Sequence, residues 1–121
     1  MRRRLNRSWQ LLLVLFLSLA IACSSQRRRT DEELGLNAQQ ARGRRVYDQR
    51  CAMCHEAYSS SSLRGPSMQE LFKKPYMPSG TPANDERVRE VIVAGRAKMP
   101  GFGRVLTDQQ IEDLLAYLHT L

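Results

Sequence analysis

Cys51-Ala52-Met53-Cys54-His55 is the stretch that decides the fold of this sequence of 121 residues. Its two thiols stand about one helical turn apart, and a histidine follows the second thiol directly. This C-x-x-C-H pattern is typical of covalent haem attachment, in which the thiols add to the two vinyl groups of the porphyrin. The imidazole of His55 then faces the iron. The motif therefore predicts one covalent haem c bound by Cys51, Cys54 and His55.

Three other kinds of site use the same residue types. A thioredoxin-like dithiol would need a βαβ context, and the sequence contains none. A zinc site would need four ligands, but the only further candidate is His119, far along the chain. A disulfide between Cys51 and Cys54 would close a very tight loop. Haem attachment is the interpretation that best fits this spacing.

A methionine far from the motif is the candidate for the second axial ligand. Met99 precedes Pro100, which disfavours helical conformation at Met99 and predicts an extended loop there. Such a loop can bring the sulfur to the far side of the porphyrin. Met53 lies inside the attachment turn, from which its sulfur points poorly for an axial ligand. Spacing alone does not exclude Met68 or Met77 as the ligand. Most methionines fill cores, but the proline and the flanking glycines favour Met99.

Helical patterns surround the motif, and no run alternates in the manner of a strand. We expect helices over residues 38–50, around residue 71, from 85 or 86 to just before Gly95, and from 108 towards the C-terminus. The capping signals that begin them are Asn37 with Gln40, Ser67 with Glu70, Asn84 or Asp85, and Thr107 with Gln110. The last helix carries an apolar stripe of Ile111, Leu114, Leu115 and Leu118. The prediction is an all-α domain, with three to four helices wrapped around one haem.

The chain from about Asn37 to Leu121 resembles a class I (monohaem) cytochrome c. The matching positions are Gly43, Tyr47, the C-x-x-C-H motif, Gly65-Pro66, Met99-Pro100, Phe102, Leu114 and Tyr117. The resemblance implies that His55 and Met99 are the axial ligands. It also implies that the Pro66 carbonyl accepts a hydrogen bond from the second nitrogen of His55, which would orient the ring. Gly43 and Tyr47 would cross the last helix near Leu114 and Tyr117.

A cytochrome of this kind is expected to carry electrons rather than to catalyse a reaction. Two axial ligands leave the iron no open position, and a thioether ligand favours the ferrous state. We therefore predict one-electron transfer between a redox protein donor and an acceptor, as a shuttle or as a haem subunit of a respiratory complex. The alternative is a haem enzyme or gas sensor with an open sixth position, which requires that Met99 does not bind iron.

The N-terminal region predicts export and membrane attachment. Residues 1–10 are rich in arginine, and the apolar run 11–22 is too short to span a bilayer comfortably but fits a signal-peptide core. The stretch Leu19 to Cys23 resembles a bacterial lipobox, although the leucine more often stands three residues before the cysteine.

We expect a signal peptide over 1–22, a tether over 23–36 acylated at Cys23, and the cytochrome c domain over 37–121. An uncleaved anchor, or ordinary cleavage beside an incidental cysteine, stays open. In each version the domain lies outside the cytoplasm, in the periplasm or on the outer face of a membrane.

The positive charge of the chain belongs to its N-terminal region. The formal net charge is +7, with four arginines within residues 1–22 and three more at positions 27–29. The remaining residues include 12 basic and 12 acidic side chains. A neutral domain offers no basic face for a phosphate backbone, so we expect no nucleic-acid partner.

Overall fold

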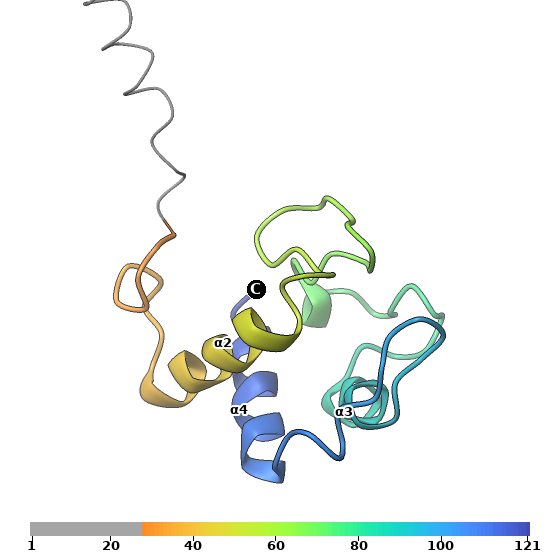
Figure 1. Ribbon diagram of the computed structural model, residues 1–121. Helices are drawn as coiled ribbons and strands as arrows, with labels where there is room; N and C mark the ends of the chain where they lie inside the picture. Colours follow the sequence, from red (N-terminus) through yellow and green to blue (C-terminus); the bar gives the residue numbers. More distant parts are fainter. Residues whose placement is uncertain (1–27) are drawn as a thin grey trace, which may run out of the picture. The chain divides into compact units, whose positions relative to one another are not determined.

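The computed structural model describes residues 28–121 and is drawn in Figure 1. The chain divides into two units, residues 1–30 and 31–121. The predicted signal peptide and Cys23 lie outside the described residues. The elements described are three α-helices and one short 3-10 helix: α2 (Ala38–Arg50), η1 (Leu71–Lys73), α3 (Asp85–Ala94) and α4 (Asp108–Leu118).

The all-α prediction is confirmed. Within residues 28–121 no strand forms, and only isolated bridges join Tyr76 to Pro82 and Arg96 to Met99. Nor does this part of the chain contain a helix that is long and apolar enough to cross a membrane. Helix α4 supplies more of the buried apolar side chains than any other element, and α2, η1, α3 and the loops supply the rest: Val46, Tyr47, Ala57, Leu71, Val88, Ile92, Leu106, Ile111, Leu114, Leu115, Tyr117, Leu118 and Leu121.

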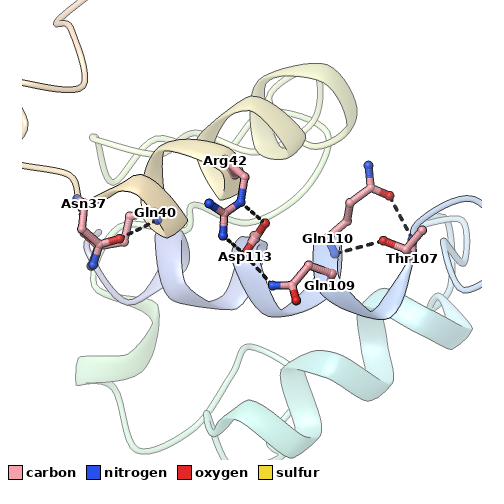
Figure 2. Close-up of polar contacts among 7 residues, drawn as sticks. All are labelled: Asn37, Gln40, Arg42, Thr107, Gln109, Gln110 and Asp113. Atoms are coloured by element: carbon pink, nitrogen blue, oxygen red, sulfur yellow. Dashed lines mark hydrogen bonds and ion pairs between the residues drawn. The ribbon is translucent and has the colours of Figure 1, made fainter.

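Capping boxes begin two of the helices, as the sequence predicts. At α2, the Asn37 side chain accepts from the backbone N–H of Gln40, whose own side chain accepts from the Asn37 N–H, both at 2.9 Å (Figure 2). Thr107 and Gln110 make the same reciprocal pair at α4. At α3, the Asn84 side chain accepts from the backbone N–H three residues on. At these three starts the free backbone N–H groups bond to side chains within three residues, so the sequence alone can predict them.

The predicted capping box at Ser67 and Glu70 is wrong. The Ser67 hydroxyl donates to the carbonyl of Ser59 and accepts from the backbone N–H of Gln69 at 3.0 Å. It therefore bonds to the loop before η1 and does not cap a helix. Glu70 is in the left-handed conformation, with φ 56°, and its side chain caps nothing. Only the single turn of η1 forms after it.

Helices α2 and α4 cross at very close range (Figure 1). A Cβ placed on Gly43 would lie 1.8 Å from the carbonyl oxygen of Asp113 and 2.9 Å from Cβ of Tyr117. The rings of Tyr47 and Tyr117 meet edge to face, with centroids 5.4 Å apart. The predicted crossing is thus confirmed, and it depends on the missing side chain at position 43.

An ion pair between a half-exposed arginine and a buried aspartate lies beside this crossing. Nε of Arg42 on α2 donates to the Asp113 carboxylate of α4 at 2.7 Å, and the Gln109 side-chain amide donates to the same carboxylate at 3.0 Å (Figure 2). Hydrogen bonding from Arg42 lowers the pKa of Asp113 against the opposing effect of burial. The buried carboxylate therefore stays ionised and links the two helices.

Polar and aromatic contacts join α4 to α3 and η1. Arg89 of α3 pairs with Glu112 of α4. His119, which follows α4, lies 2.6 Å from the carboxylate of Asp85 at the start of α3. The same imidazole stacks on Phe72 of η1 at a centroid distance of 3.8 Å. These contacts place α3, and the loop that follows it, relative to α4.

The folded unit begins before the predicted domain boundary at residue 37. Residues 31–35 form a turn in which the Leu36 N–H donates to the Asp31 carbonyl at 2.9 Å. The Asp31 carboxylate pairs with Arg44 of α2 at 2.6 Å, and Leu36 packs against the core. Residues 31–36, predicted as part of the tether, therefore belong to the domain.

Candidate haem-attachment site

The C-x-x-C-H motif forms a turn that continues α2. The backbone N–H of Cys51 still donates to the Tyr47 carbonyl at 2.8 Å, and the Cys51 carbonyl then accepts from Cys54 and His55, both at 3.0 Å. Both thiols are free and partly buried. Burial, helped by the neighbouring Cys54, raises the pKa of the Cys51 thiol to about 11. Helical geometry thus keeps two unpaired thiols about one turn apart.

The imidazole of His55 is oriented by the loop that returns towards the motif. Its Nδ1 lies 2.8 Å from the carbonyl oxygen of Pro66. A carbonyl can only accept, so Nδ1 must carry the hydrogen, and in the neutral ring Nε2 then presents a lone pair. The contact that the resemblance implies is present in the structure. It selects the tautomer in which Nε2 can bind a metal.

Gly65 lets the returning loop lie directly against this ring. A Cβ at position 65 would stand 2.4 Å from Cε1 and 2.8 Å from Nδ1 of His55. The Gly65 N–H donates to the Cys54 carbonyl at 2.8 Å, which fixes the loop to the attachment turn. The absence of a side chain at position 65 is therefore a requirement for the bond between His55 and Pro66.

The backbone of His55 is held by Tyr47. The Tyr47 hydroxyl donates to the His55 carbonyl at 2.7 Å. Tyr47 is itself buried between α2 and α4, where its ring packs on Tyr117. The crossing of the two helices thereby determines where the attachment turn ends.

Met99 belongs to a separate segment, the loop that follows α3. Arg96 and Met99 exchange two backbone hydrogen bonds, at 3.0 Å and 2.9 Å, and so close a tight turn. Ala97 lies at its corner with φ 51°, a conformation that costs a residue with a side chain about 1–2 kcal/mol. Met99 is partly buried and is not helical, as Pro100 predicts.

Both sides of the Met99 loop are attached to the end of α3. Gly95 leaves the helix with φ 76°, and a Cβ there would lie 2.6 Å from the carbonyl oxygen of Met99. Beyond the turn, the Phe102 N–H donates to the Ile92 carbonyl at 2.8 Å. Helices leave their last carbonyls without internal partners. Here the loop carrying Met99 supplies such a partner and is thereby fixed in position.

The other methionines near the motif differ in exposure. Met53, inside the attachment turn, is 74% exposed. Met68 and Met77 are partly buried and pack against the core. The structure thus brings Cys51, Cys54, His55 and Pro66 together through direct hydrogen bonds and carries Met99 on a loop fixed to α3.

These residues fit a covalent haem. The donor set consists of two free thiols and an imidazole whose tautomer leaves Nε2 available to iron. Within residues 28–121, no three His, Cys, Asp or Glu side chains gather in a group that could hold a metal ion. Two free thiols about one turn apart, with an imidazole directly after the second, are the residue types that thioether attachment of a haem requires.

Comparison with known proteins agrees with this geometry. The family model described as cytochrome c oxidase, cbb3-type, subunit III matches residues 38–118. The chain belongs to this family of cytochrome c domains. This cytochrome is also 33% identical over 78 residues to cytochrome c6 of Rippkaea orientalis, an alignment that covers 64% of the chain and 67% of that protein. It is a monohaem class I cytochrome c with covalent haem c, and it transfers electrons between redox partners.

Two features of the site could not be inferred from the sequence. The first is the hydrogen bond from the Tyr47 hydroxyl to the His55 carbonyl, which depends on how the fold places the Tyr47 side chain beside the attachment turn. Tyr58 is the second, because its hydroxyl meets that of Tyr117, 59 positions away, at 2.7 Å. No motif surrounds Tyr58, so no signal in the sequence could have identified this contact.

Proposed function

We propose that this cytochrome is an exported, membrane-tethered carrier of single electrons. In this proposal Cys51 and Cys54 hold the haem through thioether bonds. His55 and Met99 are its axial ligands, and Pro66 orients the histidine. The observation that carries the proposal is the 2.8 Å contact between Nδ1 of His55 and the Pro66 carbonyl, which leaves Nε2 to the iron. The way the Met99 loop is held on α3 supports a fixed sulfur ligand.

The proposed ligand pair accounts for electron transfer without catalysis. When bound, the haem supplies an iron that alternates between the ferrous and ferric states. His55 and Met99 would stay in place in both states, so little rearrangement would accompany each transfer. A thioether ligand favours the ferrous state and raises the reduction potential. Two filled axial positions also disfavour oxygen or peroxide chemistry.

The tether proposal gains a limit from the structure. If Cys23 carries the lipid, residues 24–30 are the part of the chain that separates it from the folded unit, which begins at Asp31. A segment of this length extends at most about 25 Å. The domain would therefore meet partners that lie close to the membrane surface.

The proposed partners are redox proteins of a respiratory membrane. The matching family model is described as a subunit of a cytochrome c oxidase, and this supports a haem subunit of a respiratory complex. The relative named cytochrome c6 is not described as a subunit of a complex, so the role of a free shuttle is proposed as well. Purification from membranes under mild conditions tests the two roles, because a subunit stays with its complex and a shuttle separates from it.

The decisive experiment is the intact mass of the mature protein, made in a host that attaches haem. Covalent haem adds roughly 600 Da to the chain, and a Soret band accompanies it. A Cys51→Ser, Cys54→Ser double variant provides the control that carries no thioether. A wild-type mass equal to that of the amino acids and lipid alone would overturn the proposal.

The axial methionine is tested by comparing three variants of matched chemistry. We expect Met99→Ala to lose the weak far-red sulfur-to-iron band of the ferric protein, to bind external ligands and to have a lower potential. Met68→Ala and Met77→Ala should keep the band. Loss of the band in one of these two variants, with Met99→Ala unchanged, would identify another ligand. A high-spin ferric spectrum in the wild type would instead indicate an enzyme or sensor with an open site.

The lipid anchor is tested by fractionation of cells. Cys23→Ser removes the thiol that would be acylated, so the haem-loaded domain should move from the membrane to the soluble fraction. Ser24→Ala changes the neighbouring residue and should leave the protein in the membrane. Retention of the Cys23→Ser protein would point to an uncleaved signal anchor.

A further inference from the structure

The imidazole of His119 contacts two other elements of the fold at once. His119 directly follows α4 and is half-exposed. Its Nε2 lies 2.6 Å from a carboxylate oxygen of Asp85, the first residue of α3. A carboxylate only accepts, so Nε2 carries the hydrogen and donates it. The ring also stacks on Phe72 of η1, with centroids 3.8 Å apart and planes 12° apart. One side chain thus joins the end of α4 to α3 and to η1.

The stack on Phe72 leads to the segment that carries the proposed ligand His55. Before η1, the Met68 N–H donates to the carbonyl of Glu56 at 2.7 Å. Glu56 comes directly after His55 in the chain. This backbone bond fixes the start of η1 to the end of the attachment turn, so the His119 ring packs against an element that is held on the His55 side of the site.

The hydrogen bond to Asp85 leads to the segment that carries the proposed ligand Met99. Helix α3 has ten residues and is therefore about 15 Å long, with Asp85 in its first turn. The far end holds the Met99 loop, because the Phe102 N–H donates to the Ile92 carbonyl at 2.8 Å. A regular helix moves as a rigid element. A shift of α3 at Asp85 would therefore also move the loop at its other end.

Helix α3 is held in place by few buried side chains. Two of its ten residues are buried, Val88 and Ile92, whereas six of the eleven residues of α4 are buried. An ion pair between Arg89 and Glu112 adds a polar link from α3 to α4. That link joins two helices, whereas the His119 ring also contacts η1. His119 therefore holds α3 relative to two neighbours at once.

We propose that His119 is a positioning residue, which holds α3 so that the sulfur of Met99 stays at the iron. The inference rests on the proposed function, because it needs Met99 as an axial ligand. Both polar groups of the contact are partly exposed, and exposed pairs add little to global stability. Their effect is local: they limit the opening of α3 and its loop, which is the motion that gives an external ligand access to the iron.

The test measures this opening directly in the ferric, haem-loaded protein at pH 7. Imidazole in large excess takes the place of Met99 when the loop opens, so the rate at which the far-red band disappears reports the opening. Loss of a hydrogen bond and a ring stack should make His119→Ala about three- to tenfold faster than the wild type. The midpoint of urea unfolding should change little.

Two further variants test the partner of the imidazole. Asp85→Ala removes the acceptor and should accelerate the exchange as His119→Ala does. Glu86→Ala is the matched control, because it removes the neighbouring exposed carboxylate from the same first turn of α3. Its rate should stay near that of the wild type. Because His119 and Asp85 act as one contact, the double variant should be no faster than the faster single variant.

The conservative variant separates positioning from a general loss of structure. His119→Gln keeps an N–H donor and a flat amide, so its rate should lie close to that of the wild type. An unchanged rate in His119→Ala, or equal acceleration in Glu86→Ala, would overturn the positioning role. A faster exchange that merely parallels a loss of global stability would overturn it as well.

Two checks keep this outcome separate from other failures. If His119→Ala is poorly folded by circular dichroism, the comparison of Asp85→Ala with Glu86→Ala decides. A wild type without the far-red band would refute Met99 as the ligand before any variant is compared, and the positioning role with it. A wild type that has the band, beside a His119→Ala protein with unchanged exchange, would refute the positioning role alone.

Discussion

The close crossing of α2 and α4 predicts a strong effect of Gly43→Ala. Alanine has the higher helix propensity, so an isolated helix would gain about 1 kcal/mol from this change. In the folded protein, however, the new Cβ would lie 1.8 Å from the Asp113 carbonyl oxygen and 2.5 Å from its carbonyl carbon. Both atoms belong to the backbone, so no change of rotamer can relieve the contact. The helices must separate.

The magnitude follows from the size of that separation. An ordinary contact needs about 3.4 Å, so the two helices would have to move apart by well over 1 Å at this point. Overpacking of a well-packed core typically costs about 1–3 kcal/mol and sometimes more, and a clash with backbone belongs at the upper end. After the gain in propensity, we expect a net loss of about 2 kcal/mol or more in the free energy of unfolding. For a domain of this size that corresponds to a melting temperature roughly 8–16 °C lower.

Denaturant and thermal unfolding of the haem-loaded protein measure this loss. Gln49→Ala, at an exposed position of the same helix, is the matched control and should change stability by less than about 0.5 kcal/mol. A Gly43→Ala protein as stable as the wild type, or more stable, would show that α2 and α4 do not cross in backbone contact. Helix propensity would then govern this position.

Other contacts of the domain lead to three more expected outcomes. Asp113→Asn should lower stability at pH 7 by about 1–3 kcal/mol. Because hydrogen bonding from Arg42 lowers the pKa of Asp113, its stabilisation is present above the ordinary carboxyl pKa and is lost as the pH falls below it. Urea unfolding at pH 7 and pH 3 should therefore show a smaller acid-induced loss in the variant than in the wild type, and equal losses would contradict this. Gly65→Ala should turn the His55 ring from its carbonyl partner, make it a weaker base and raise the reduction potential; an unchanged potential with full haem loading would refute it. Gly95→Ala combines a φ of 76° with a backbone clash, so it should weaken the far-red band, and an undisturbed spectrum would count against the proposed ligand loop.

The sequence predicts best those features that residues settle with their near neighbours. The bounds of α2 match the expected range 38–50, because the capping box at its start and the attachment turn at its end are local. The start of α4 is equally local. The C-x-x-C-H motif is also complete within five positions, so the cofactor chemistry follows from these residues alone.

Local signals mislead where a distant group competes for the same atoms. Ser67 has the spacing of a helix cap, yet its hydroxyl bonds to the loop at Ser59 instead. The segment at Asp31 has the composition of a flexible tether, yet Arg44 of α2 holds it on the domain. In both cases a partner outside the local pattern determines the conformation.

The amino-acid order alone thus establishes the all-α class, the haem-attachment turn and the starts of α2, α3 and α4, since hydrogen bonds between close neighbours decide the turn and these three starts. The need for glycine at position 43 emerges only from the folded molecule, because the reason lies in the backbone of a helix seventy residues further on. The same is true of the contact between Tyr58 and Tyr117 and of the neutralisation of Asp113 by Arg42. These contacts join residues far apart in the chain, and no local pattern encodes a distance across a folded core.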